Sequence, residues 1–265
     1  MISFYKYHGA GNDFILINDW DASFNTDDSE LISRMCNRHF GIGADGLMLL
    51  RSDKEYDFRM IYFNSDGQYG SMCGNGGRCI VAMANALGII TGETVFIASD
   101  GKHRAKVGNN GIVSLEMLPV SEIEELNQKV LIMNTGSPHY VKLVDNVDTL
   151  NLIQEARLIR NSERFKKEGI NVNFFQKTLK GIKVRTYERG VEDETLACGT
   201  GVTACAIAAH RMGIAESAVD VEALGGNLTI SFESNGKGYS NIWKTGPTQF
   251  VFEGKYHPDL GINHG

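Results

Sequence analysis

Two cysteines are the residues whose type and setting could do chemistry. Cys73 begins the sequence CGNG and Cys198 begins CGTG, and each opens a stretch rich in Ala, Ile, Val and Met that predicts a helix. A helix N-terminus carries a partial positive charge, which favours an anion and lowers the pKa of a thiol. Its exposed amides can also bind a carboxylate. A thiol in this setting can take up and release a proton at a carbon atom.

The two cysteine motifs belong to a longer internal repeat. Residues 73–89 align without a gap on residues 198–214, at an offset of 125 residues. The same offset places Tyr62 on Tyr187, although other positions, such as Gly46, do not match their counterparts. Two copies of one domain are therefore predicted.

Short runs of β-branched and aromatic residues, bounded by Gly, Asn and Asp, predict strands around each apolar stretch. We expect an α+β fold of two pseudo-symmetric domains, each a mixed, mostly antiparallel sheet wrapped around a central hydrophobic helix. The N-terminal half is expected over residues 1–118 and the C-terminal half over residues 119–253, because a polar stretch begins after Pro119. The tail, from about 254 to 265, is expected to pack back on the N-terminal half.

Composition and charge narrow the classes of partner. The chain has 265 residues, of which 42% are hydrophobic and 22% charged, which is typical of a globular protein. No apolar stretch is long enough to cross a bilayer, and a net charge of -6 without a dense Lys/Arg cluster argues against nucleic acid and membrane surfaces. The N-terminus does not resemble a signal peptide. We expect a cytoplasmic protein with a small-molecule partner.

Opposed thiols would allow a specific reaction. If the two halves face each other through their pseudo-symmetry, Cys73 and Cys198 converge on one cleft. One thiolate could then remove a proton from one face of a carbon while the other thiol delivers a proton to the opposite face, which is epimerisation or racemisation by two bases. Cys36, Cys79 and Cys205 lie in apolar surroundings and are expected to be core residues.

Polar residues suited to an amino-acid ligand occur in the glycine-rich motifs of both halves. Glu188 and Arg189 offer opposite charges, and His139 could help to ionise a thiol. Further donors and acceptors come from four amides, those of Asn12, Asn64, Asn75 and Asn171. The cysteines and histidines lack the spacing of a metal site, so no metal is expected.

A series of motifs that spans nearly the whole chain resembles the diaminopimelate epimerase family. The motifs are HGAGNDF from His8, FNSDG from Phe63, CGNG from Cys73, GSPH from Gly136, NVNF from Asn171, YERG from Tyr187, ETLACGTG from Glu194 and TGP from Thr245. The resemblance implies an enzyme without pyridoxal phosphate, metal or other cofactor. It would interconvert LL- and meso-2,6-diaminopimelate, in lysine and peptidoglycan precursor synthesis, and act as a homodimer.

The resemblance also implies roles for individual residues. Cys73 and Cys198 correspond to the acid/base pair, with His139 and Glu188 setting the protonation states of Cys73 and Cys198 respectively. The reacting carboxylate would be held by backbone amides, those of Gly74, Asn75, Gly199 and Thr200. The rest of the substrate would be held by Asn12, Asn64, Asn171, Glu188 and Arg189, with Arg189 on the distal carboxylate.

The chain departs from the commonest family pattern at three positions. Gly46 stands where many members have Gln, and Met72 where a Gln often precedes the first cysteine. Ser137 replaces an Asn before Pro-His, so the hydrogen bond to substrate at that position is expected to be absent or mediated by water.

Three other functions stay open from the sequence. A proline or hydroxyproline racemase shares the paired Cys-Gly-x-Gly motifs, but its first motif usually carries His where Asn75 stands here. A non-catalytic amino-acid-binding or metal-binding module would use the thiols only as ligands. A racemase that depends on pyridoxal phosphate would need a Schiff-base lysine.

Overall fold

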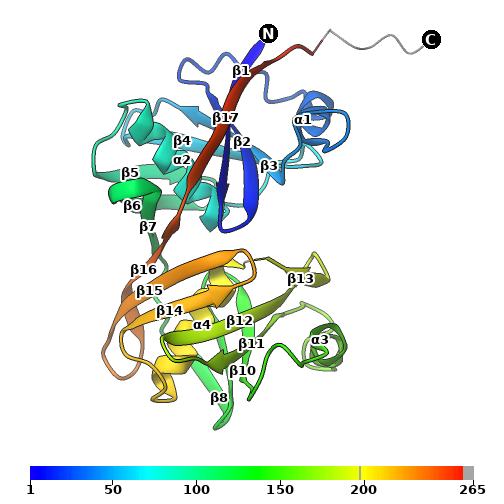
Figure 1. The fold of residues 1–265 in the computed structure, drawn as a ribbon, viewed down its shortest axis with the longest axis vertical. Helices are drawn as coiled ribbons and strands as arrows, with labels where there is room; N and C mark the ends of the chain where they lie inside the picture. The colour runs from blue at the N-terminus through cyan, green and yellow to red at the C-terminus, as the bar shows by residue number, and fades with distance from the viewer. Residues whose placement is uncertain (197, 259–265) are drawn as a thin grey trace, which may run out of the picture. The chain divides into compact units, whose positions relative to one another are not determined.

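The computed structural model describes residues 1–196 and 198–258, and its backbone contacts divide the chain into two units (Figure 1). The first unit contains Met1–Leu115 and the chain from Pro247 onward, and the second contains Glu116–Gly246. Each unit is an α+β structure with both parallel and antiparallel strand pairs, which confirms the predicted fold class.

The sheet of the first unit has mostly antiparallel neighbours. Among its described strands, two pairs are parallel, β2 with β3 and β4 with β5. In order across the sheet the strands are β17 (Gln249–Tyr256), β1 (Ile2–Gly9), β2 (Asn12–Asn18), β3 (Gly46–Arg51), β4 (Phe58–Asn64), β5 (Glu93–Ala98), β6 (Gly101–Val107) and β7 (Ile112–Met117). A short 3-10 turn, Asn109–Gly111, precedes β7.

The second unit repeats this order of parallel and antiparallel pairs. Its strands are β8 (Ile123–Asn127), β9 (Val130–Asn134), β10 (Pro138–Leu143), β11 (Asn171–Lys177), β12 (Gly181–Glu188), β14 (Ala218–Ala223), β15 (Gly226–Ser234) and β16 (Tyr239–Pro247), with β13 (Asp193–Thr195) as a hairpin on β12. The repeated topology supports the duplication inferred from the sequence.

Four helices make the crossovers that parallel strands require. In the first unit α1 (Ser29–Cys36) joins β2 to β3 and α2 (Gly74–Ala86) joins β4 to β5; in the second, α3 (Leu152–Arg160) joins β10 to β11 and α4 (Gly199–Arg211) joins β12 to β14. The sequence analysis did not predict α1 or α3. Both have a side-chain N-cap. The Asp28 side chain accepts a hydrogen bond from the Leu31 amide, and the Asn151 side chain accepts one from the Gln154 amide.

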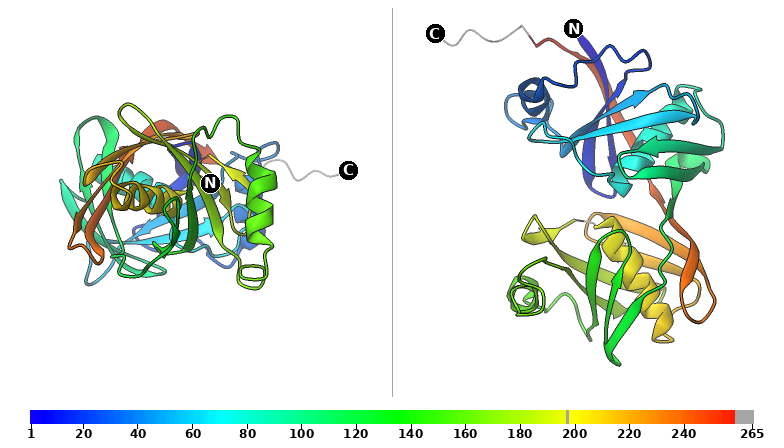
Figure 2. Two further views of the ribbon diagram at one scale, coloured as in Figure 1. Left: turned by 90° about the horizontal axis from the view of Figure 1, so that it is seen from below. Right: turned by 180° about the vertical axis from the view of Figure 1, so that it is seen from behind.

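The two cysteine-bearing helices are the central helices of their units. Every residue of α4 from Gly201 to Ala209 is buried, and the strands of the second unit enclose this helix (Figure 2). Helix α2 is likewise buried on most of its surface. A helix that is apolar nearly all round has to be covered on all sides, which explains why each sheet wraps around its helix.

The predicted ends of these helices are confirmed. Gly88 and Gly213 follow the C-caps of α2 and α4 with φ of 70° and 69°, a left-handed conformation that glycine adopts without steric cost. The amides of Ile89 and Ile214 then bond back to the carbonyls of Ala84 and Ala209, at 3.0 and 2.8 Å. These bonds close each helix in the same way.

The domain boundaries differ from the expected ones. Strand β17 pairs with β1 from Gln249 to Tyr256, so residues 247–253 belong to the first unit and not to the C-terminal half. The pairing supplies the ladder hydrogen bonds of both strands, which is why the return to the first unit comes earlier than residue 254. The division after Leu115 also precedes the expected seam at residue 118. Residues 259–265 of the expected tail lie outside the described residues.

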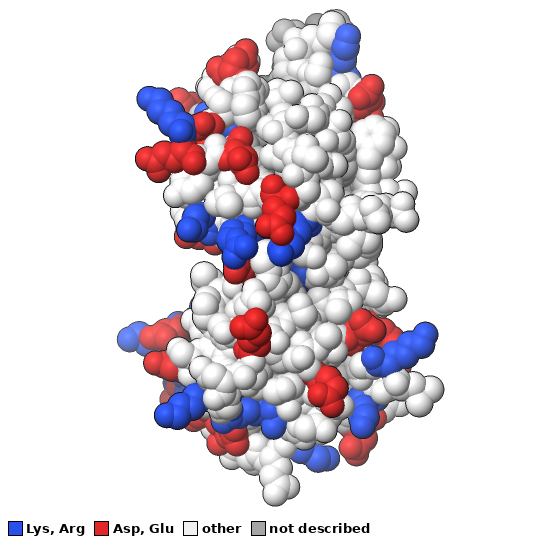
Figure 3. Space-filling view, turned by 90° about the vertical axis from the view of Figure 1, so that its left-hand side faces the viewer, with Lys and Arg blue, Asp and Glu red and all other residues white. Residues whose placement is uncertain are grey.

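Within the described residues, none of the helices is both long and apolar enough to span a membrane. On the face shown in Figure 3, acidic and basic side chains are interspersed.

Candidate functional site

Cys73 and Cys198 hold equivalent backbone positions at the N-termini of α2 and α4. Each is the N-cap residue in an extended conformation, with φ of -97° and -86°. The carbonyl of Cys73 accepts from the amide of Gly77 at 2.7 Å, and that of Cys198 from Val202 at 3.0 Å. Both thiols therefore stand where the helix favours negative charge.

The predicted carboxylate-binding amides lie at the same two helix ends. Gly74 and Asn75 are the first residues of α2, and Gly199 and Thr200 are the first residues of α4. The first amides of a helix have no acceptor in the preceding turn, so they can donate to an external oxygen atom.

The Cys198 thiol is held in its protonated form. It is 6% exposed, and burial together with the Glu188 carboxyl raises the pKa of the thiol to about 11. The Thr200 hydroxyl, the Gly201 amide and the Lys244 ammonium oppose this increase. The Thr200 oxygen lies 3.5 Å from the Cys198 sulfur. At neutral pH the resting second unit thus presents a proton donor.

Glu188 ends strand β12 and is half-buried, and burial raises the pKa of its carboxyl. Its charge raises the pKa of the Cys198 thiol, and the role of Glu188 in the protonation of Cys198 stays a prediction. A carboxyl of raised pKa near a thiol can exchange a proton with it more readily than an exposed carboxylate can.

The three remaining cysteines are core residues, as expected. Cys36, Cys79 and Cys205 are at most 3% exposed. Burial raises the pKa of the Cys36 and Cys79 thiols to about 12 and raises that of Cys205 well above its usual value. They remain neutral thiols.

His139 is fully buried on β10 and is neutral. Burial, aided by the positive charge of Arg189, lowers the pKa of its imidazole to about 3. The Asn173 amide nitrogen lies 3.0 Å from Nδ1 and 3.1 Å from the Tyr140 carbonyl, while its oxygen accepts from the Thr186 hydroxyl at 2.9 Å. This network assigns Nδ1 as the acceptor and places the proton on Nε2. His139 is thus a donor rather than a base.

The buried neutral imidazole predicts a loss of stability in acid. Below the unfolded pKa of about 6.5, His139 of the unfolded chain binds a proton that the folded chain does not bind until about pH 3, so falling pH favours unfolding. We expect the free energy of unfolding of the second unit to fall by about 2 kcal/mol between pH 7.5 and pH 5 through this residue. Urea unfolding in a Trp20→Phe background, where Trp243 reports on the second unit, measures it.

His139→Asn is the matched control, because its amide oxygen can still accept from Asn173 but does not titrate. The variant should be less stable at pH 7.5 and should lack about 2 kcal/mol of the pH dependence. An equal pH dependence of the free energy of unfolding in the parent and in His139→Asn would show that folding does not lower the pKa of His139.

Asn171, Ser137 and Arg189 form one hydrogen-bonded group in the second unit. The Asn171 amide donates to the Ser137 hydroxyl at 2.8 Å and to the Pro138 carbonyl at 3.0 Å, and its oxygen accepts from the Arg189 amide at 2.8 Å. The Arg189 guanidinium donates to the Glu168 carbonyl at 3.2 Å and to Ser137 at 3.4 Å. Ser137 therefore links Asn171 to Arg189 within the protein and can still donate its own proton.

Arg189 itself is exposed, and no carboxylate of the described residues forms an ion pair with it. Its guanidinium has five N–H donors, of which only two are used by the Glu168 carbonyl and Ser137. The others are available to an anion.

In the first unit, Asn12 and Asn75 bond to each other. The Asn75 amide donates to the Asn12 oxygen at 2.7 Å, and the Asn12 amide donates to Asp45 at 2.9 Å. This chain of contacts fixes the first turn of α2, which carries Cys73, against β2. Asn12 and Asn75 thus have structural bonds besides any contact to a ligand.

Asn64 ends β4, is exposed, and its side chain makes no hydrogen bond to other described residues. The neighbouring Gly46 has no room for the Gln that many family members carry, because a Cβ atom there would lie 2.5 Å from the Phe63 carbonyl oxygen and from the Tyr62 ring. Tyr62 fills that space. Met72 packs on the core of the first unit.

Three contributors to the site were not identified from the sequence: Asp45, Asn173 and Lys244. Asn173 lies in the NVNF motif, and its alternation with Asn171 along a strand was a usable signal. Nothing in the sequence alone joins Asp45 to Asn12 or Lys244 to Cys198.

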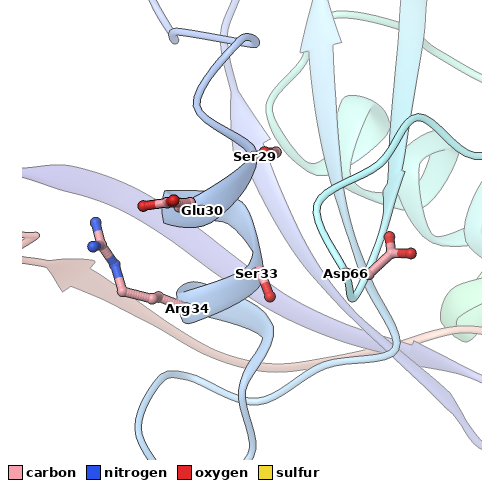
Figure 4. A pocket seen from close by; sticks show the side chains of 5 residues that line it. All are labelled: Ser29, Glu30, Ser33, Arg34 and Asp66. Atoms are coloured by element: carbon pink, nitrogen blue, oxygen red, sulfur yellow. The ribbon is translucent and has the colours of Figure 1, made fainter.

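A pocket beside α1 contains none of these groups. It is lined by Ser29, Glu30, Ser33, Arg34 and Asp66, which Figure 4 shows on α1 and on the turn after β4. Among residues 1–196 and 198–258, no group of three His, Cys, Asp or Glu side chains is placed to hold a metal ion.

Comparison with known sequences identifies relatives. The sequence profile described as diaminopimelate epimerase matches residues 4–117 and 131–251. A diaminopimelate epimerase of Flavobacterium psychrophilum is 47% identical over 251 residues, which cover 94% of this chain and 98% of that protein. That of Aquifex aeolicus is 40% identical over 279 residues, covering 98% and 99%.

Solved structures share the fold at low sequence identity. A phenazine biosynthesis protein of the PhzF family from Bacillus anthracis has a TM-score of 0.74 at 13% identity, covering 97% of this chain and 99% of its own. A probable proline racemase from Agrobacterium radiobacter has a TM-score of 0.64 at 18% identity, covering 99% and 95%. These similarities are to the fold alone.

Proposed function

The chain belongs to the diaminopimelate epimerase family, and we infer from this membership that it is an isomerase that interconverts LL- and meso-2,6-diaminopimelate. Full-length similarity to the epimerases of two organisms supports the activity. The observation that carries the chemistry is the duplicated cysteine, present as the N-cap residue of the central helix in each unit. This reaction serves lysine and peptidoglycan precursor synthesis.

We propose that Cys73 and Cys198 are the two bases. One thiolate takes the α-proton of the substrate, and its S–H bond forms as the C–H bond breaks. The pair of electrons left on the carbon is delocalised into the carboxylate, which the helix N-termini stabilise. The opposing thiol then gives its proton to the other face and is left as a thiolate. No oxidant, metal or cofactor takes part in this step.

The protonated Cys198 supports a resting enzyme in which Cys198 is the acid and Cys73 is the base. Glu188 is assigned to Cys198, whose pKa it raises. The assignment of His139 to Cys73 is a prediction, and the neutral imidazole with its proton on Nε2 favours stabilisation of a thiolate by a donated hydrogen bond rather than proton removal.

We assign the reacting carboxylate to the amides of Gly74, Asn75, Gly199 and Thr200, which lie at the two helix N-termini. The remainder of the substrate is assigned to Asn12, Asn64, Asn171, Glu188 and Arg189. The exposed donors of Arg189 suit a second carboxylate, which diaminopimelate has and proline lacks.

The test of the function is proton NMR of LL-diaminopimelate incubated with the enzyme in D2O. We expect the meso isomer to appear, with deuterium at one α-carbon of the product and almost none in early recovered substrate, because each thiol meets one face. L-proline offered under the same conditions should remain unchanged. Racemisation of proline, or binding of diaminopimelate without exchange, would favour the racemase or the non-catalytic binding module instead.

We further propose that the enzyme acts in the cytoplasm as a homodimer, and that its only partner besides a second copy is the small-molecule substrate. The exposed apolar side chains of β17 support the dimer. Phe250, Val251 and Phe252 are 47%, 49% and 44% exposed. Consecutive apolar residues on an edge strand are suited to cover by another protein surface.

The dimer is tested by Val251→Asp, which places a charge in this apolar strand. We expect the parent to elute as a dimer and the variant as a monomer, because burying an unpaired carboxylate at an interface is costly. Size-exclusion chromatography with light scattering gives the two masses. Leu179→Asp, at a fully exposed turn of the second unit, is the control and should remain dimeric. A monomeric parent would contradict the proposal.

A further inference from the structure

Strand β16 places a lysine at an unusual position in the second unit. Lys244 is completely buried, although its neighbours on the same face of the strand, such as Ile242, are apolar core residues. Opposite it in the sheet lies Ile230, which is also completely buried. A lysine is rarely buried to this degree, since removing an ammonium group from water is costly unless a negative charge compensates.

The ammonium group lies at the start of α4. A Cβ atom at Gly199, the first residue of that helix, would be 2.3 Å from the Lys244 nitrogen. The glycine therefore leaves the space that the ammonium occupies. Cys198, the N-cap residue, directly precedes this glycine.

The Lys244 ammonium and the N-terminus of α4 both contribute positive charge at this point of the second unit. Together they favour an anion at the same helix end. The described titratable groups that interact with the Cys198 sulfur are Glu188 on β12, Cys205 further along α4 and Lys244.

Of these titratable groups only Lys244 favours a negative sulfur, in the same direction as the hydrogen bonds from the Thr200 hydroxyl and the Gly201 amide. Glu188 disfavours it, and Cys205 is a neutral buried thiol. We propose that Lys244 is a positioning residue that stabilises the thiolate formed when Cys198 gives its proton to the substrate. This inference rests on the proposed role of Cys198 and extends it to a residue on another strand.

The first unit also has a buried cation near its cysteine. This residue lies in the cysteine-bearing helix itself, whereas Lys244 lies on strand β16. Arg78 lies within α2 and is completely buried, and its guanidinium is 3.4 Å from the Gly74 carbonyl. The 125-residue offset places Arg78 on Thr203 and Lys244 on Pro119, so the two cations are not copies of each other. Each unit thus has a buried positive charge near the helix end that bears its cysteine, at positions that the offset does not relate.

The test compares Lys244→Met and Lys244→Arg with the parent. Methionine retains an unbranched side chain without the charge, whereas arginine retains the charge. The readout is the rate at which a small alkylating reagent modifies Cys198 as a function of pH, measured by peptide mass spectrometry. Cys73 in the same molecule is the internal control.

For Lys244→Met we expect the Cys198 alkylation profile to move about one pH unit upward, with roughly tenfold slower alkylation at pH 8 and the Cys73 profile unchanged. The kcat of epimerisation should fall by a similar factor, because the thiolate left on Cys198 after proton donation is less stable without the ammonium. Lys244→Arg should retain most of the parent profile. Ile242→Met, which places methionine on the same face without removing a charge, should leave both cysteines unaffected.

An unchanged Cys198 profile in a folded Lys244→Met protein would overturn the inference, whatever happens to activity. If Lys244→Met does not fold, Lys244→Arg provides the test. An upward shift of its Cys198 alkylation profile by about one pH unit, which is the shift expected for loss of the charge, would also overturn the inference. The alkylation readout needs no substrate. A parent enzyme that alkylates as expected but does not epimerise diaminopimelate would therefore contradict the proposed function and leave the role of Lys244 standing.

Discussion

Replacing Cys198 with alanine is expected to reduce epimerisation of diaminopimelate roughly 10³-fold or more, and Cys73→Ala should do the same. Each thiol is proposed to serve one face of the α-carbon, so inversion needs both. Because Cys198 is held as a protonated thiol, its loss removes the resting proton donor. Turnover is measured by NMR or by a coupled assay of the meso product.

Proton exchange without inversion distinguishes two bases from one. In D2O, Cys198→Ala retains the Cys73 base, so it should still exchange the α-proton of one configuration and return deuterium to the same face. Cys73→Ala should exchange the opposite configuration, slowly, because the Cys198 thiol must first ionise from a pKa of about 11. A single base that reaches both faces would instead leave one variant with normal inversion.

Cys205→Ala is the matched control for these variants. Cys205 lies in the same helix as Cys198, is completely buried and has a strongly raised pKa, so it takes no part in proton transfer. Its replacement should lower the stability of the second unit and leave kcat nearly unchanged. If either Cys73→Ala or Cys198→Ala retained turnover within tenfold of the parent, the two-base assignment would be wrong.

Much of the fold could be predicted because the strongest patterns belong to the most buried elements. The continuous apolar stretches after Cys73 and Cys198 predict helices with the correct glycine ends. Strands such as β3 and β7 contain the short apolar runs from which strands were predicted around each helix. Helices α1 and α3 were missed because they are short and amphipathic, although Asp28 and Asn151 are recognisable caps.

The candidate site could be predicted only in part. The cysteines are visible because their type, spacing and duplication coincide in the sequence. The Asn12–Asp45 and Ser137–Arg189 contacts join residues that are far apart in the chain, and no local pattern specifies them. The position of Lys244 beside Gly199 likewise follows from how β16 passes α4. The loss of a hydrogen bond from position 137 to substrate stays a prediction, and within the protein Ser137 accepts a hydrogen bond from Arg189.

Arg189→Met is expected to lower kcat/KM for diaminopimelate about 10²-fold, which corresponds to roughly 2–3 kcal/mol for the loss of charged hydrogen bonds. The guanidinium is held by the Glu168 carbonyl and Ser137, which orient it and leave several N–H donors for a second carboxylate. Since Arg189 is exposed, its replacement should leave the stability of the unit nearly unchanged, so the loss reports on binding.

Two further variants separate the charge of Arg189 from its orientation. Arg189→Lys retains the charge without the planar fork and should recover only part of the lost kcat/KM, because an ammonium cannot bind a carboxylate through two parallel bonds. Ser137→Ala removes one of the two bonds that orient the guanidinium and should cost less, about 1 kcal/mol. Diaminopimelate turnover by Arg189→Met at the parent rate would show that the distal carboxylate is recognised elsewhere. Turnover of proline by the parent would show that a second carboxylate is not required. Proline has one carboxylate, and the amides at the helix N-termini would bind it.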